Sequence, residues 1–226
     1  MSDQYEKAMK YYSWCLSCPS THSENQQMYD EWAETYDKDH KLLDCNGPQY
    51  LANAVADFFP QHRQDICILD VAAGTGLVGE ELQKLGFCNI ESLEPNKNMI
   101  AIAKKKNVYR KYFEENIPET GSTNIGKDVY DVVVCRGGFG GGCLPINSLS
   151  EMLRVTKPGG YVAINTNPKT FDVVPMYANI FVPLMKNLEE LGQWKKVKEE
   201  HHNNYIAGTT GIILVFQKTP QHIRNC

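Results

Sequence analysis

The spacing of apolar and aromatic residues ahead of position 60 is typical of helices. Residues 1–25 are polar, and we expect them to form a loosely held N-terminal arm. From 28 to 59, apolar side chains recur every three or four positions, the period of an amphipathic helix. One face of that helix carries a mostly aromatic stripe: Tyr29, Trp32, Ala33 and Tyr36. A second helical pattern runs from about 49 to 59, between Pro48 and Pro60.

From Ile66 onward, short apolar runs of strand length alternate with amphipathic helical patterns. The strand-like runs are ICILD (66–70), NIESLE (89–94), VYRKYF (108–113), YDVVVC (130–135), YVAINT (161–166), KKVKEEHHNNY (195–205) and GIILVFQK (211–218). The helical patterns span 77–85, 96–106, 148–155 and 175–191, the last with a kink expected at Pro183. The run 130–135 is almost fully apolar, which is typical of a parallel strand buried on both faces.

This alternation predicts one α/β domain, residues 26–226, built on a doubly wound, mostly parallel sheet of seven strands. The last two runs flank a turn near Gly208 and predict an antiparallel hairpin at one edge. The 226 residues are 42% hydrophobic and 22% charged, an ordinary globular composition with enough length for one such domain.

Charge and hydropathy narrow the classes of partner. A net charge of −4 offers no basic surface for nucleic acid. No run approaches the roughly 20 apolar residues of a membrane helix, and the polar N-terminus lacks the apolar core of a signal peptide. We therefore expect a cytoplasmic protein that acts on a small molecule, with a protein substrate as the alternative. The oligomeric state stays open.

The eight cysteines include one closely spaced pair, Cys15 and Cys18, with His22 nearby. A structural zinc site needs four ligands, and no second C-x-x-C or H-x₃-H follows. A redox pair would stand where a strand feeds a helix, whereas this one lies in the polar N-terminal segment. The sequence favours free thiols and no metal site.

A glycine motif follows the first strand-like run: Gly74, Gly76 and Gly79 fit G-x-G-x-x-G. Such a loop holds either a dinucleotide or S-adenosylmethionine. Asp70 stands four positions before Gly74, and an unpaired carboxylate inside a central strand is costly. We therefore expect the strand to end near Leu69 or Asp70, with the acid at the mouth of the site facing the ammonium and sulfonium groups of S-adenosylmethionine. Gly74 and Gly76 let the backbone approach the ligand, and Gly79 packs the helix on the sheet.

Glu94 ends the second strand-like run, 18 residues after Gly76. An acid in that place accepts hydrogen bonds from both ribose hydroxyls. Enzymes that use NAD share this feature, so it does not distinguish the two ligands. The alternative for Glu94 is an exposed loop acid.

These motifs, in this order, resemble those of class I S-adenosylmethionine-dependent methyltransferases. ILDVAAGTG resembles the first motif, with Ala72 where glycine is frequent, a change we expect to fit if φ there is negative. LEPNKNMIAIA resembles the acidic motif, YDVVVCRGGF the fourth strand and LRVTKPGGYVAI the turn into the fifth. With YDEWAETYDKD ahead of the sheet, the chain is also similar to the methyltransferase-like proteins of this family. The resemblance implies a Rossmann-like methyltransferase fold, an N-terminal helical lid and S-adenosyl-L-methionine as cofactor.

The resemblance leaves the adenine contact open. The family often has an aspartate near the end of the third strand, and alignment on Ile117 places Phe113 there. Glu114, Glu115 or a backbone group are the candidates for holding the adenine amine.

The segment RGGFGGGC, 136–143, follows the fourth strand, where such sheets bind ligands. Its glycines indicate either close backbone approach or a mobile flap, with a plain connector as the alternative. Arg136 either clamps an acidic substrate group or pairs with a surface carboxylate, and we favour the surface pair. The residues assigned to the cofactor are Trp32, Tyr36, Asp70, Ala72, Gly74, Thr75, Gly76, Leu77, Glu94, Pro95, Asn96, Met99, Glu114, Cys135, Arg136 and Gly137.

The function that these features favour is methyl transfer to a small molecule. Displacement at a sulfonium needs no protonation of the leaving group, so a base is optional and the sequence identifies no catalytic residue. One alternative is a module that binds S-adenosylmethionine without turnover and acts through protein partners. Another is a nicotinamide-dependent reductase, which Asp70 and the lack of a Tyr-x-x-x-Lys pair disfavour.

Overall fold

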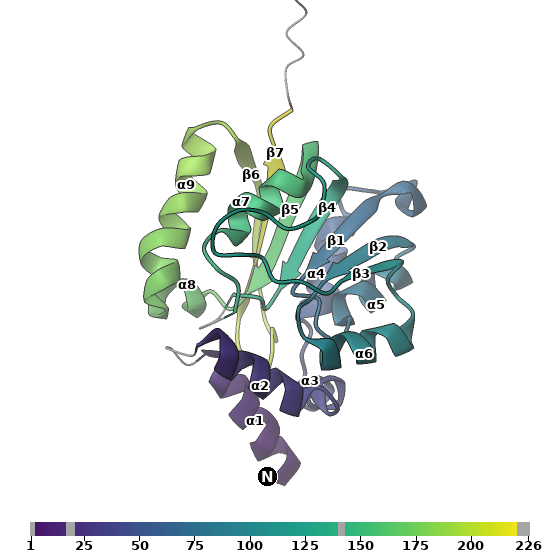
Figure 1. Cartoon of the computed structure of the whole chain (residues 1–226), viewed down its shortest axis with the longest axis vertical. Helices are drawn as coiled ribbons and strands as arrows, with labels where there is room; N and C mark the ends of the chain where they lie inside the picture. Colours follow the sequence, from purple (N-terminus) through teal and green to yellow (C-terminus); the bar gives the residue numbers. More distant parts are fainter. Residues whose placement is uncertain (1–2, 17–20, 140–142, 221–226) are drawn as a thin grey trace, which may run out of the picture.

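The computed structural model describes residues 3–16, 21–139 and 143–220. Its centre is one sheet with helices on both faces (Figure 1). The strands are β1 (Cys67–Val71), β2 (Asn89–Leu93), β3 (Lys111–Phe113), β4 (Tyr130–Arg136), β5 (Thr156–Thr166), β6 (Trp194–His202) and β7 (Gly211–Lys218). They lie in the order β3-β2-β1-β4-β5-β7-β6.

The sheet is parallel from β3 to β5, and β7 runs antiparallel to both β5 and β6. The predicted seven-stranded sheet with an antiparallel C-terminal hairpin is therefore confirmed. The chain builds outward from β1 in one direction and from β4 in the other. Open sheets of this kind bind ligands where the order reverses, beyond the carboxyl ends of those two strands.

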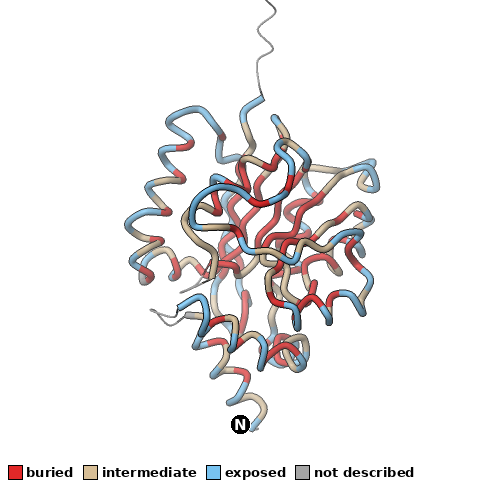
Figure 2. Tube along the Cα trace, in the orientation of Figure 1, coloured by how far each residue is buried: buried red, intermediate tan, exposed pale blue. Residues whose placement is uncertain are grey.

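Two hydrophobic clusters cover the two faces of the sheet. The helices behind them are α4 (Gly47–Ala56), α5 (Leu77–Lys84) and α6 (Lys97–Lys106) on one face, and α7 (Ser148–Val155) and α9 (Val182–Glu190) on the other. Successive residues of a strand point to opposite faces. In β1, accordingly, Ile68 belongs to the α4–α5 cluster and Leu69 and Val71 to the α7–α9 cluster. Buried residues run along the central strands (Figure 2).

The helices ahead of the sheet are more broken than we expected. The helical pattern that begins at 28 is divided between α2 (His22–Trp32) and α3 (Tyr36–Leu42), whereas the second pattern, expected from about 49 to 59, corresponds to α4. Thr21 and Glu24 start α2 with a capping box. The break before α4 follows from Asp44, which has a left-handed φ of 49°, and from Pro48, which stands in the first turn of α4.

Residues placed by prediction in a polar arm form the helix α1 (Asp3–Leu16). Ala8 and Tyr12 are buried in a third cluster with Leu43 and Tyr205. α1 therefore packs on the segments around α3 and the β6–β7 connection. In Figure 1, α1, α2 and α3 lie together below the sheet.

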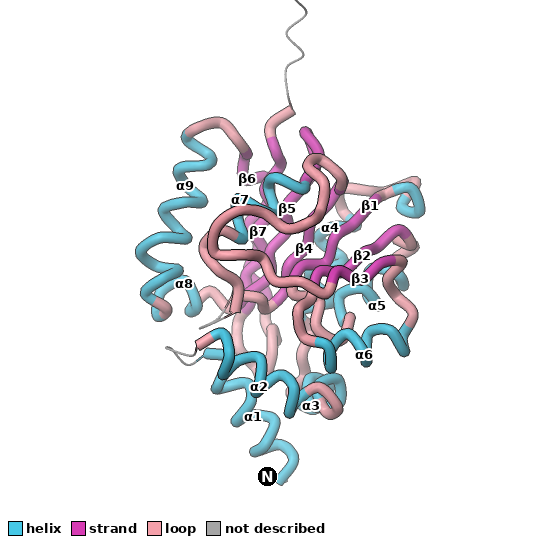
Figure 3. Tube along the Cα trace, in the orientation of Figure 1, coloured by secondary structure: helices cyan, strands magenta, loops and turns pink. Residues whose placement is uncertain are grey.

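Two connections depart from the predicted pattern. The turn expected at KPGG lies within β5, where the register against β4 shifts between Tyr130 and Val132. The irregularity expected at Pro183 takes the form of a π-helical turn, Tyr177–Phe181, between α8 (Lys169–Val173) and α9. Residues 114–129, between β3 and β4, form a loop without a helix (Figure 3).

Candidate functional site

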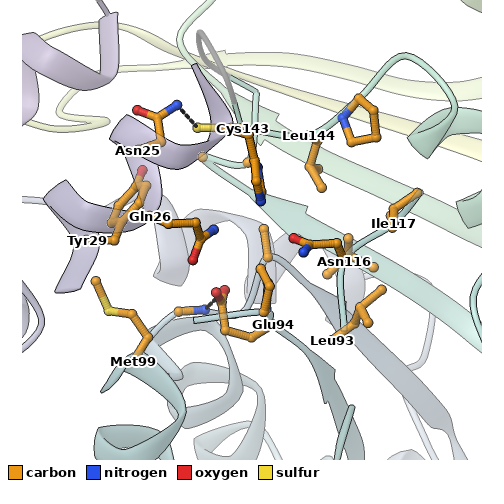
Figure 4. Close-up of a pocket in the computed structure, with 18 of the residues that line it drawn as sticks. Asn25, Gln26, Tyr29, Leu93, Glu94, Met99, Asn116, Ile117, Cys143 and Leu144 are labelled. Atoms are coloured by element: carbon orange, nitrogen blue, oxygen red, sulfur yellow. Dashed lines mark hydrogen bonds between the residues drawn. The ribbon is translucent and has the colours of Figure 1, made fainter. Parts of the chain in front are cut away.

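A pocket of about 710 Å³ lies at the carboxyl ends of β1, β2 and β4. This volume is in the range of small-molecule and cofactor sites. Its floor comes from the loops that follow these strands, and α2 covers it. Figure 4 shows Gln26 and Tyr29 on α2 and Glu94 after β2 around the same space.

Asp70 is not at the mouth of this pocket, and that prediction is wrong. β1 continues to Val71, so Asp70 lies within the strand and is 1% exposed. The Tyr109 hydroxyl donates a 2.7 Å hydrogen bond to Asp70 Oδ2. Burial raises the pKa of Asp70 to about 7, although the Tyr109 hydrogen bond lowers it. A partner 39 residues away and a raised pKa together make an acid inside the strand tolerable.

Two backbone N–H groups hold the carboxylate of Glu94 at the floor of the pocket. The Gly74 N–H donates to Oε2 and the Asn96 N–H to Oε1, both at 2.9 Å. Burial raises the pKa of Glu94, and these two N–H donors lower it in part. Each carboxylate oxygen has a further acceptor site beyond the bond it already makes, so two neighbouring hydroxyls can be bound at once.

Glu94, Ala72 and Arg136 form a row across the strand ends. Leu93 and Cys135 both pair in register with Val71, and each of the three is followed by one member of the row. Since neighbouring strands are about 4.8 Å apart, the Cα atoms of Glu94 and Arg136 lie roughly 10 Å apart, on opposite sides of the end of β1.

The glycine loop differs from expectation at one position. Ala72 has a φ of 55°, so the condition of a negative φ is not met. Gly74 also has a φ of 55°, and a Cβ added there would meet nothing within 4 Å, so its backbone faces the open pocket. Gly79 packs against the ring of Tyr109, which lies 2.7 Å from where a Cβ would be.

α2 is tied to both ends of the pocket. At one end, Asn96 Nδ2 donates to Asp30 Oδ1 of α2 at 2.9 Å, while Asn96 Oδ1 caps α6 by accepting the Met99 N–H. At the other end, Asn25 of α2 contacts the Cys143 thiol, as the dashed line in Figure 4 marks. The lid therefore depends on specific polar contacts at two places.

The aromatic stripe is divided between the pocket and the protein interior. Tyr29 and Tyr36 line the pocket, whereas Trp32 is 1% exposed and does not. Trp32 stacks on Tyr29 and donates its indole N–H to Asp39 Oδ2 at 2.9 Å. Trp32 therefore packs against Tyr29 on the side of α2 that faces away from the pocket.

Arg136 contradicts the expectation of a surface ion pair. Among the described residues, no ion pair includes it. Arg136 is one of the residues that line the pocket, and its guanidinium lies over the ring of Tyr205, 4.6 Å from the centroid.

Glu114 lies outside the pocket lining, where it forms an exposed ion pair with Lys104 at 2.7 Å. Its neighbours Glu115 and Asn116 line the pocket instead. Both glutamates lie in the loop after β3, where Glu114 is exposed and Glu115 is half-buried.

The ten remaining assigned residues divide into two groups. Five line the pocket: Ala72, Gly74, Pro95, Met99 and Gly137. Five do not: Thr75, Gly76, Leu77, Asn96 and Cys135. Thr75 donates to Asp37 Oδ1 at 2.5 Å, which joins the loop to α3. The lining residues that we missed include His22, Asn25, Gln26, Asn116, Ile117, Leu144, Val174 and Met176. The capping box at Thr21 is the one signal that marks 22–26 as helical.

The described residues contain no cluster of three or more potential metal ligands. Cys15 is a free thiol, and Cys18 lies outside the described residues. None of the described helices is long and apolar enough to cross a membrane.

Comparison with known proteins identifies the family. A family model described as a methyltransferase domain matches residues 43–210. The chain belongs to this methyltransferase family. The resemblance inferred from the motifs is therefore confirmed, and membership implies S-adenosylmethionine as the cofactor.

Individual members of the family are similar over much of the chain. Methyltransferase-like protein 27 of Homo sapiens is 30% identical, over 74% of this chain and 66% of its own length. Demethylmenaquinone methyltransferase of Renibacterium salmoninarum is 28% identical, over 61% of this chain and 56% of its own length. A solved structure from Methanococcus maripaludis, a candidate S-adenosyl-L-methionine-dependent methyltransferase, superposes with a TM-score of 0.55 at 19% identity, over 90% of this chain and 95% of that one. This chain thus spans at most about two thirds of the two curated relatives.

The family assignment does not depend on Asp70, which lies outside the pocket lining. The residues that do line the pocket include the carboxylate of Glu94, the open backbone at Gly74, Tyr29 of α2 and Tyr36 of α3, and their chemistry is compatible with this cofactor. Carboxylate and aromatic faces suit a ribose and a sulfonium cation respectively.

Proposed function

We propose that this protein is an S-adenosylmethionine-dependent methyltransferase that acts on a small molecule. The observation that carries the proposal is Glu94, a buried carboxylate fixed by two backbone N–H groups at the floor of a closed-over pocket, in a chain of the methyltransferase family.

The proposal assigns the cofactor to the part of the pocket around the ends of β1 and β2. Glu94 holds the ribose hydroxyls, and the backbone of Ala72 and Gly74 lies against the ligand. Met99 and Ile117 supply apolar walls for the adenine, and Asn116, next to Ile117 in the chain, supplies a polar group. Tyr29 of α2 and Tyr36 of α3 cover the site.

When bound, S-adenosylmethionine supplies a methyl group on a sulfonium. The residues of this chain have three tasks: to fix the orientation of the two reactants, to exclude water and to leave an open path for an in-line approach. α2 performs the second task, held by Asn96 at one end and by Cys143 at the other. No proton needs to be supplied to the leaving group, so the proposal names no general acid.

A small acceptor suits the shape of the site. α2 and the loops around Leu144 and Met176 enclose the pocket, and its lining is mainly apolar. As part of the same proposal, residues 26–226 form the methyltransferase domain and the protein works in the cytoplasm, in keeping with the free thiol of Cys45.

Isothermal titration calorimetry tests the cofactor assignment directly. We expect S-adenosylmethionine and S-adenosylhomocysteine to bind and NADH not to bind. Glu94→Gln is expected to weaken both sulfur ligands by about 10- to 100-fold, because hydrogen bonds to a charged group are lost. Glu114→Gln is the matched control and should leave the affinities unchanged, since Glu114 lies outside the pocket lining. Binding of NADH alone would refute the proposal.

Turnover is tested separately, with methyl-labelled S-adenosylmethionine and a panel of small molecules. Transfer of label that Glu94→Gln reduces supports a methyltransferase. Tight binding of the cofactor with no labelled product across the panel would favour a binding module that acts through protein partners.

A further inference from the structure

Arg136 is a cation in the pocket wall without a counter-charge among the described residues. Its Nη1 contacts His40 Nε2 at 3.3 Å, and its Nη2 donates to the Cys45 thiol sulfur at 2.9 Å. Its buried Nε has no hydrogen-bond partner among the described residues. Neither partner is a carboxylate. An arginine side chain stays charged at any pH at which a protein is folded.

The surroundings of Arg136 add positive rather than negative charge. The guanidinium Nε is 2.8 Å from the place where a Cβ of Gly47 would be, so Arg136 lies against the first residue of α4. The amino end of a ten-residue helix carries a partial positive charge. His40 is neutral, because burial and the charge of Arg136 lower its pKa to about 3. An uncompensated cation in such a place is costly to the free protein.

The guanidinium also points away from Glu94, at the end of the row where we place the cofactor. Its neighbours are His40 of α3, Cys45 between α3 and α4, Gly47 at the start of α4 and Tyr205 of the β6–β7 connection. Arg136 itself ends β4, on the side of β1 opposite β2. The pocket surface between Arg136 and the outer loops is apolar, with Leu144, Val174 and Met176.

We propose that Arg136 binds the carboxylate of the methyl acceptor, and that the acceptor is an organic acid with an apolar body. The planar guanidinium fork matches a carboxylate, which supplies the missing charge and accepts the unused N–H donors. The apolar wall receives the rest of the molecule. This inference rests on the proposed function, because it assigns the acceptor side of that same pocket.

The cofactor has a carboxylate of its own, on its methionine part, and this is the competing occupant. The two possibilities differ in a measurable way. If Arg136 binds the acceptor, replacing it should change the affinity for S-adenosylhomocysteine by no more than about threefold. If Arg136 holds the cofactor carboxylate, replacing it should lower that affinity by about tenfold or more.

The experiment uses benzoate as the probe, with benzamide as its uncharged counterpart and phenyl phosphate as a second anion. Each is titrated into the full chain, with and without saturating S-adenosylhomocysteine, while the ¹⁵N–¹H resonance of Arg136 Nε is followed by NMR. We expect benzoate to shift this resonance and benzamide not to. Arg136→Gln should weaken benzoate binding by at least about tenfold, Arg136→Lys by less, and the exposed Arg110→Gln not at all.

The outcomes separate this inference from the proposed function. If S-adenosylhomocysteine binds and benzoate does not, or if benzamide binds equally well, the acceptor assignment is wrong while the methyltransferase proposal stands. If phenyl phosphate binds and benzoate does not, the acceptor is not a carboxylate. If Arg136→Gln loses S-adenosylhomocysteine, Arg136 serves the cofactor. If S-adenosylhomocysteine does not bind the wild-type chain at all, the proposed function itself fails, whatever benzoate does.

Discussion

Tyr109 donates a 2.7 Å hydrogen bond to Asp70 in the interior of the sheet, and both side chains are at most 5% exposed. The other carboxyl oxygen, Oδ1, has no hydrogen-bond partner among the described residues. The pair explains how an acid occupies a central strand, and it makes the stability of the free protein depend on pH.

Replacing Asp70 by asparagine is expected to remove a pH dependence of folding. Burial raises the pKa of Asp70 from 3.8 to about 7, so the folded state binds a proton that the unfolded state releases above pH 4. The free energy of unfolding of the cofactor-free protein therefore falls as the pH rises from about 4 to about 7, by on the order of 4 kcal/mol from this group. Asp70→Asn should flatten that part of the curve and be the more stable protein at pH 8.

Urea denaturation at pH 4.5, 6 and 8 measures this difference. The exposed Asp57→Asn serves as the control and should follow the wild-type slope. Parallel curves for Asp70→Asn and the wild type would show that Asp70 does not titrate in this range.

The sequence alone predicted the sheet well because the sheet depends on local patterns. The apolar run at 130–135 and the glycine after 73 identify a strand and a turn from neighbouring residues. The position of Glu94 in the pocket follows in the same way from its place at the end of a strand, while its contact with the ribose stays a prediction. These features need no knowledge of distant partners.

The positions of Asp70 and Arg136 could not be predicted in the same way. The partner of Asp70 stands 39 residues later, and the contacts of Arg136 come from segments around 40, 45 and 205. Whether a charged residue is paired, neutralised or left open depends on such contacts. Trp32 is a third example, because only packing decided which member of the aromatic stripe faces inward.

The hydroxyl of Tyr109 can be tested on its own. Tyr109→Phe leaves the carboxyl of Asp70 without its hydrogen bond, and we expect a loss of about 1–3 kcal/mol in the free energy of unfolding. Tyr112→Phe removes a longer bond, 3.3 Å to the Ala103 carbonyl, from a half-buried ring and should cost less. In an Asp70→Asn background the two tyrosine variants should still rank in this order. Equal losses would contradict a special role for the Tyr109–Asp70 pair.

Ala72 is expected to be a site where glycine is the better residue. Its φ of 55° lies in the left-handed region, which costs a residue with a Cβ roughly 1 kcal/mol. Ala72→Gly should raise the midpoint of thermal unfolding, whereas Ala73→Gly, one residue later and without a positive φ, should lower it. Calorimetric scans of the two variants provide the comparison. The same sign for both changes would show that the loop is not strained at Ala72.

Asn96 is expected to couple the stability of α6 to closure of the lid. Its side chain caps α6 through the Met99 N–H and binds Asp30 of α2. Asn96→Ala should lower the free energy of unfolding by about 1–2 kcal/mol through the lost cap. It should also speed dissociation of S-adenosylhomocysteine in stopped-flow experiments, since α2 loses an anchor. Asn98→Ala removes only an exposed 3.1 Å contact to Asp30 and should leave the dissociation rate close to that of the wild type.

A substitution at Gly47 is expected to shift the side chain of Arg136 without removing its charge. A Cβ at Gly47 would lie 2.8 Å from Arg136 Nε, 2.9 Å from Asn165 Oδ1 and 3.1 Å from the Tyr205 ring, so at least one of these groups has to move. We expect Gly47→Ala to displace the guanidinium, which makes the shortest of these contacts, while the glycine loop and Glu94 stay in place. We expect benzoate binding to weaken several-fold and the affinity for S-adenosylhomocysteine to stay within about threefold.

The stability of Gly47→Ala should change little, because overpacking of about 1–3 kcal/mol opposes a gain in helix propensity of about 1 kcal/mol. Asn53→Ala, an exposed change in the same helix, has the gain in propensity without the contact and should leave benzoate binding unchanged. Unaltered benzoate binding in Gly47→Ala would mean that the position of Arg136 against α4 is not what shapes the anion site.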